Sequence, residues 1–127
     1  MAKLLYTING DSLYPVFKSG DSVELKKIKT VSRFDYVVFD FLERLICKQV
    51  VGMPGDTFEI ISDKLVINND KEYPMYGRKT LQHFSESYNK VLLDDEYIVL
   101  GNNNSVDSAN FGPVNRKLII GKLNAKS

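Results

Sequence analysis

Residues 35–56, DYVVFDFLERLICKQVVGMPGD, contain the pattern that decides the fold. Two runs rich in β-branched and aromatic residues, DYVVFDF (35–41) and LICKQVV (45–51), are separated by LER alone, which predicts a tight β-hairpin. The turn-forming residues MPGD (53–56) follow directly. The segment therefore predicts two paired strands with a turn after the second one.

Similar short strands and turns continue on both sides of this hairpin. The other predicted strands are DSVELKK (21–27), TFEII (57–61), KLVIN (64–68), KEY (71–73), EYIVL (96–100) and KLIIGKL (117–123). Short strands at close spacing, separated by Gly, Pro and Asn turns, are typical of all-β domains. We expect one domain over residues 1–127, a small barrel or coiled sheet with little helix.

The composition excludes several classes of function. The 127 residues include 17 basic and 16 acidic side chains, well mixed, which gives no electrostatic footprint for nucleic acid. No metal-ligand spacing is present, and we expect neither a metal nor a cofactor. No apolar run approaches the roughly 20 residues of a membrane-spanning helix, and MAKLLYTING (1–10) does not read as a secretory signal peptide. Taken alone, the chain is expected in the cytoplasm if its start is native.

The stretch GDSLYP (10–15) raises the question of whether Ser12 is a nucleophile. Gly, Asp, Ser and Pro are common turn formers, so local chemistry alone favours a turn residue. A serine–histidine or cysteine–histidine site would need His83, the only histidine, which lies in a polar stretch without recognisable partners. The single cysteine, Cys47, permits no internal disulfide.

Four blocks, in order, resemble the motifs of the type I signal peptidases. They are GDSLYPVFKSGDSVELKK (10–27), RFDYVVF (33–39), KQVVGMPGD (48–56) and GNNNSVDSANFGPV (101–114) followed by IIGK (119–122). The corresponding family patterns are Gly-x-Ser-Met-x-Pro, Arg-Gly-Asp-Ile-Val-Val-Phe, Lys-Arg-Val-Val-Gly-Leu-Pro-Gly-Asp and Gly-Asp-Asn-x-x-x-Ser-x-Asp-Ser-Arg. The related self-cleaving repressor peptidases share the first block and a serine–lysine pair, but they lack the third block. The resemblance therefore favours the signal peptidases.

This resemblance implies a serine endopeptidase with Ser12 as nucleophile and Lys48 as general base, acting through an acyl-serine intermediate. A lysine can accept the serine proton only when it is neutral, and burial disfavours the charged ammonium. Because strand neighbours alternate faces, Lys48 should share an aliphatic face with Ile46 and Val50, while Cys47 faces the core on the other side.

The family also implies supporting residues. Gly10 stands at an oxyanion-hole position, Ser105 matches a serine that orients the lysine, and Asp107 matches an aspartate that braces the floor of the site. By position in the motifs, the side chains expected to line the substrate pockets are Ile8, Leu13, Phe17 and Val38.

The sequence departs from the family pattern at four supporting positions. Leu13 replaces the usual methionine, a volume-conserving change. Asn102 replaces an aspartate, Gln49 replaces the arginine after the lysine, and Ala109 replaces the arginine that pairs with the equivalent of Asp107. These changes remove supporting charges and put the rate and the rigidity of the site in question.

The resemblance implies a peptide or preprotein substrate, bound as an extended strand and cut after small residues, with no nucleic acid partner. It also implies a cell-membrane location with the catalytic domain on the outer side, and a membrane surface as a further partner. Two alternatives stay open: a signal-peptidase-like binding or assembly protein with weak catalysis, and a soluble self-cleaving peptidase of the repressor type. The oligomeric state is left open.

Overall fold

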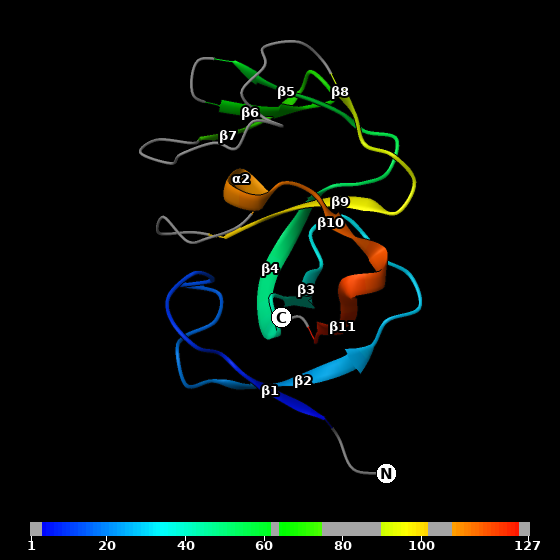
Figure 1. Cartoon of the computed structure of the whole chain (residues 1–127). Coiled ribbons are helices and arrows are strands. Elements are labelled where there is room, and N and C mark those ends of the chain that lie inside the picture. Colours follow the sequence, from blue (N-terminus) through cyan, green and yellow to red (C-terminus); the bar gives the residue numbers. More distant parts are fainter. Residues whose placement is uncertain (1–3, 62–63, 75–89, 102–107, 125–127) are drawn as a thin grey trace.

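The chain folds into two antiparallel sheets in a computed structural model that describes residues 4–61, 64–74, 90–101 and 108–124 (Figure 1). The larger sheet has the strand order β1 (Leu5–Thr7), β2 (Ser22–Lys27), β11 (Ile119–Leu123), β3 (Tyr36–Phe41), β4 (Arg44–Gly52), β9 (Glu96–Leu100) and β10 (Val114–Asn115). The smaller sheet has the order β7 (Lys71–Pro74), β6 (Lys64–Ile67), β5 (Thr57–Ile61) and β8 (Lys90–Val91). Helix within the described residues amounts to one turn of α2 (Ser108–Phe111) and the 3₁₀ turn η1 (Arg116–Leu118).

This architecture confirms the expected all-β fold with little helix. The described residues contain no helix long and apolar enough to cross a membrane. The predicted central hairpin is β3–β4, but its loop is only Leu42–Glu43, because Arg44 already pairs with Phe41. Both loop residues have positive φ, 51° and 66°, the backbone of a type I′ turn that matches the twist of the flanking strands.

Strand β4 contributes to all three apolar clusters that the described residues form. Cys47 packs in the cleft cluster, which comprises Ile8, Leu13, Phe17, Val23, Val38, Cys47 and Leu123. Val50 packs in the central cluster, with Ile28, Val31, Val37, Phe39, Tyr97, Val99, Val114 and Ile119. Val51 belongs to the cluster beneath the smaller sheet, with Phe58, Leu65, Ile67, Leu92, Ile98 and Leu100. Because both faces of β4 are covered, its sequence is a nearly continuous apolar run and does not alternate between apolar and polar residues.

The two sheets approach closely at the end of β4. A Cβ built on Gly52 would lie 2.9 Å from Cβ of Ile98 and 3.0 Å from Cδ1 of Leu92. Only a residue without a side chain leaves room there for β9 and for the segment that leaves the smaller sheet after β8. This close approach therefore requires Gly52, the first glycine of the KQVVGMPGD block.

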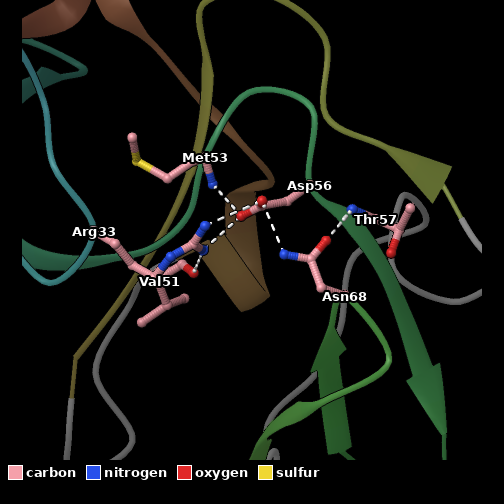
Figure 2. Close-up of polar contacts among 6 residues, drawn as sticks. All are labelled: Arg33, Val51, Met53, Asp56, Thr57 and Asn68. Atoms are coloured by element: carbon pink, nitrogen blue, oxygen red, sulfur yellow. Dashed lines mark hydrogen bonds and ion pairs between the residues drawn. The ribbon is translucent and has the colours of Figure 1, made fainter.

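A polar clamp ties the smaller sheet to β4 (Figure 2). Arg33 Nη1 donates to Asp56 Oδ2 at 2.6 Å and to the Val51 carbonyl at 3.0 Å, while its Nη2 donates to Asp56 Oδ1 at 3.1 Å. The Met53 N–H donates to Asp56 Oδ2 at 2.8 Å, and Asn68 Nδ2 donates to Asp56 Oδ1 at 3.0 Å. We call these residues the Arg33–Asp56 clamp.

The clamp sets the charge state of its carboxylate. Desolvation by burial acts to raise the pKa of Asp56, but the hydrogen bonds from Arg33, Asn68 and the Met53 N–H together with the Arg33 charge outweigh it, so the pKa is lowered from 3.8. The hydrogen bond to Asp56 in turn raises the pKa of Arg33 above its ordinary value, despite some desolvation. Both groups are therefore ionised in the folded protein across the physiological range.

Candidate active site

Ser12 lies in a compact loop that follows β1. The loop is closed at its base by two hydrogen bonds between Ile8 and the Gly20–Asp21 turn, of 2.8 and 2.7 Å. Leu13 and Phe17, 4% and 0% exposed, insert into the cleft cluster on either side of the loop. The Tyr14 N–H donates to the Asp11 carbonyl at 3.1 Å, which forms the turn that contains Ser12. Apolar anchors and backbone bonds thus hold the half-buried Ser12 on a defined loop.

Gly10 supports this loop through its backbone. Its φ is 88°, a region that L side chains rarely adopt, and nothing lies within 4 Å of where a Cβ would stand. Its N–H donates to Ser19 Oγ at 3.1 Å. The Gly10 N–H thus makes a turn contact within the loop, and the oxyanion role expected at this position stays a prediction.

Lys48 lies on the buried part of β4. The residue is only 3% exposed. On the same face of the strand lie Val50, which is fully buried, and Ile46, which packs against the central cluster. The predicted aliphatic setting of this lysine is present.

Ser12 and Lys48 line the same open cleft, which has a volume of about 890 Å³. One wall comes from β1 and the loop after it: Tyr6, Ile8, Asn9, Gly10, Asp11, Ser12 and Leu13. The other wall comes from the β3–β4 hairpin: Phe41, Leu42, Arg44, Leu45, Ile46, Cys47 and Lys48. The fold thus brings the first and third motif blocks together at one site.

The four predicted pocket residues separate into two groups. Ile8 and Leu13 line the cleft, as expected. Phe17 and Val38 do not belong to its described walls: both are 0% exposed and pack within the cleft cluster behind Ile8 and Leu13. Phe17 also stacks edge-on against Tyr36, with ring centroids 5.1 Å apart. Their role is to support the wall, because core packing covers them completely.

Several predicted positions fall where the structure gives no description. Ser105, Asp107 and Asn102 lie in residues 102–107, and His83 lies in residues 75–89; all are outside the described residues. Their relation to the cleft therefore stays a prediction from the motifs. Ala109 lies in α2, immediately after this segment.

Cys47 is buried, as the strand alternation predicts, and 4% exposed. Desolvation raises the pKa of its thiol to about 12, against the opposing effect of the Lys48 charge. The thiolate is the reactive form of cysteine, so this thiol is not prepared for nucleophilic chemistry although it touches the cleft.

Tyr6 and Ser108 are among the residues near the motif blocks that the sequence did not single out. Tyr6 lines the cleft from β1, a strand of three residues that periodicity cannot detect. Ser108 is fully buried, and its Oγ accepts a hydrogen bond from the Val99 N–H at 2.8 Å, which fixes the start of α2 to β9. Its place in the fourth motif block was the available signal.

Comparisons with known proteins agree with this geometry. A family model described as signal peptidase, peptidase S26, matches residues 2–127. Signal peptidase I S of Bacillus subtilis is 33% identical, over 91% of this chain and 72% of the relative. Signal peptidase IB of Staphylococcus aureus (strain N315) is 31% identical, over 93% of this chain and 74% of the relative.

The fold is also found in a solved structure. A signal peptidase I from Enterococcus faecalis V583 superposes with a TM-score of 0.55, covering 76% of this chain and 99% of that one. At 24% identity this likeness concerns the fold alone. The family match along almost the whole length places the chain in the signal peptidase family, peptidase S26.

Proposed function

We propose that the chain is a serine endopeptidase that cleaves signal or leader peptides after small residues, with Ser12 as nucleophile and Lys48 as general base. The observation that carries the proposal is that these two residues, from separate motif blocks, line one cleft. Family membership supports a peptidase, and the relatives are signal peptidases by name. The preprotein substrate follows from that likeness.

The proposed chemistry begins with proton transfer from Ser12 Oγ to the neutral amine of Lys48. Oγ then attacks the scissile carbonyl, and collapse of the tetrahedral intermediate breaks the C–N bond while Lys48 returns the proton to the leaving amine. A water molecule, deprotonated by the same lysine, attacks the acyl-Ser12 ester and releases the new carboxyl end. Burial of Lys48 supports this role, because removal from water disfavours the charged ammonium.

The developing oxyanion needs a donor near Ser12. The Gly10 N–H is occupied by Ser19 Oγ, so we assign this role to the N–H of Ser12 itself. One well-placed donor of this kind contributes about 3 kcal/mol to the transition state.

The β4 edge beside the cleft is suited to an added peptide strand. In the two-residue hairpin, Phe41 pairs with Arg44 and the hydrogen-bonded pairs then alternate, so the N–H and C=O groups of Leu45 and Cys47 point away from β3. Among the described residues, β9 reaches β4 only from Gln49 onward. Leu45 and Cys47 can therefore bond an extended peptide running toward Lys48.

The walls of the cleft suit an apolar peptide. Leu42 and Leu45, which line it, are 81% and 52% exposed. Exposed leucines on a concave surface favour contact with an apolar ligand. The apolar segment of a signal peptide has this character.

The test is cleavage of a synthetic peptide that carries Ala-x-Ala before the scissile bond. Ser12→Ala should abolish cleavage while thermal unfolding stays nearly unchanged, because the residue is only half-buried. Ser22→Ala, at an exposed position at the start of β2, is the matched control and should cleave normally. Equal cleavage by the Ser12 variant would remove the nucleophile assignment. Binding of the peptide without cleavage by the unmodified chain would instead favour a binding or assembly protein.

A further inference from the structure

Tyr6 makes a contact across the cleft that the proposed chemistry does not use. It lies in the middle of the edge strand β1, paired with Val23 of β2, and its ring packs against the cleft cluster. Its hydroxyl donates to the Leu45 carbonyl of β4 at 3.4 Å. The contact therefore joins the two walls of the cleft.

The Leu45 carbonyl belongs to the edge of β4 that faces the cleft. The hairpin register directs this carbonyl away from β3. An extended peptide on this edge would place one of its own N–H groups on the Leu45 carbonyl. Leu45 precedes Lys48 by three residues, or about 10 Å along a strand, so the contact lies well away from the proton-transfer site.

We infer that Tyr6 is a gate on peptide binding: its hydroxyl donates to the Leu45 carbonyl, and a peptide strand that pairs with β4 competes with it for this acceptor. The inference rests on the proposed function in one respect, the extended peptide as ligand. Burial raises the pKa of Tyr6 above 10, so the hydroxyl keeps its proton and remains a donor at physiological pH. Tyr6 thus limits the affinity for an extended peptide through a backbone acceptor and takes no part in proton transfer.

The gate predicts a separation of binding from chemistry. Tyr6→Phe keeps the ring and its packing but removes the donor, so the Leu45 carbonyl becomes available to the peptide. The dissociation constant of a fluorescent Ala-x-Ala peptide is measured with Ser12→Ala chains, which prevents turnover. It should fall about threefold in Tyr6→Phe, an effect at the low end of those expected for one hydrogen bond, because a donor–acceptor distance of 3.4 Å is long. In chains with Ser12 intact, KM should fall by a similar factor and kcat should not change.

Tyr36→Phe is the matched control. Tyr36 is also a half-buried tyrosine at the border of the cleft cluster, but it packs against Phe17 and is not among the lining residues of the cleft. Removal of the Tyr36 hydroxyl should leave peptide binding unchanged. Weaker binding in Tyr6→Phe would show that the hydroxyl holds the peptide, and unchanged binding would show that the contact has no effect; either result overturns the gate.

The two proposals fail separately in these experiments. Peptide binding that Tyr6→Phe tightens, without cleavage by chains that retain Ser12, would refute the peptidase and support the gate. Cleavage with no effect of Tyr6→Phe on KM or on the dissociation constant would refute the gate and leave the peptidase intact. Absence of peptide binding in every variant would overturn the gate as well.

Discussion

Within the part of the chain that the structure describes, two ionisable side chains at opposite ends of the KQVVGMPGD block are buried, and their surroundings differ. Lys48, 3% exposed, lies in the wall of an open cleft among aliphatic neighbours. Asp56, 8% exposed, lies in the Arg33–Asp56 clamp, where three residues donate to its two oxygens. A carboxylate held in this way is fixed in its charged state, which suits structural work. A lysine beside aliphatic side chains at a cleft can lose its proton, which suits catalysis.

The largest expected effect is on activity, at the cleft. Lys48→Met keeps the length of the side chain and removes the amine, so peptide cleavage should fall by about 10³-fold or more. The free energy of unfolding at neutral pH should stay equal or rise, because methionine removes the cost of holding the Lys48 amino group away from water. Cleavage assays and urea unfolding of the same preparation measure both quantities. Retained activity would exclude Lys48 as the base.

The converse result is expected at the clamp. Asp56→Asn leaves the Arg33 guanidinium without its carboxylate, and its amide cannot accept all the donors that surround Asp56. We expect a loss of about 2 kcal/mol in the free energy of unfolding, below the roughly 3–5 kcal/mol for breaking a fully buried pair, because the Arg33 side chain is 36% exposed. The cleavage rate of the folded enzyme should change little.

The matched control for the clamp is the exposed ion pair on the smaller sheet. Lys64 and Glu72 lie 3.0 Å apart, with side chains 41% and 54% exposed. Glu72→Gln should cost less than about 0.5 kcal/mol, as exposed pairs usually do. If both variants lose the same stability, the clamp is no stronger than a surface contact and the contrast with Lys48 fails.

Acid should weaken the clamp in a defined range of pH. The pKa of Asp56 is lowered from 3.8 in the folded protein, so its stabilisation is complete above that value and is lost as pH falls toward the folded pKa. The difference in unfolding free energy between the wild type and Asp56→Asn should be constant near neutral pH and decrease below about pH 4. A difference that stays constant from about pH 5 to about pH 2.5 would contradict the assigned charge state.

The two regions also differ in how far the sequence predicts them. Alternating and apolar runs predicted the β3–β4 hairpin and most longer strands, because each pattern lies within a few consecutive residues. The pairing of Ser12 with Lys48 came from the resemblance and stays a proposal, although both residues do line one cleft. The alternation of side chains along a strand correctly predicted that Cys47 is buried.

The remaining features depend on contacts between segments distant in the sequence. Arg33 and Asp56 were both within quoted motif blocks, but nothing local reveals that one binds the other across 23 positions. Strands of two or three residues, such as β1 and β8, are too short to show a period. Phe17 and Val38 were expected in the pockets from their positions in the motifs, but both are fully buried, because position in a motif does not give the depth of burial.

The smallest expected effect concerns Phe34, which stands where the family motif Arg-Gly-Asp has glycine. Its φ is 74° and its side chain is 49% exposed. Its contacts to β4 use the backbone: its N–H donates to the Val50 carbonyl at 2.8 Å, and its carbonyl accepts from Gln49 Nε2 at 3.3 Å. A substitution can therefore relieve the backbone strain without breaking either hydrogen bond.

Phe34→Gly should raise the free energy of unfolding by about 0.5 kcal/mol. Glycine removes a left-handed penalty of about 1–2 kcal/mol, while its greater freedom in the unfolded chain takes back about 0.5–1 kcal/mol. Phe34→Ala is the informative control, because it removes the ring but keeps the strained Cβ, and it should be no more stable than the wild type. Urea unfolding with an unchanged m-value measures both variants. If alanine stabilises as much as glycine, the gain comes from removing an exposed ring, and the backbone at the start of β3 is not strained.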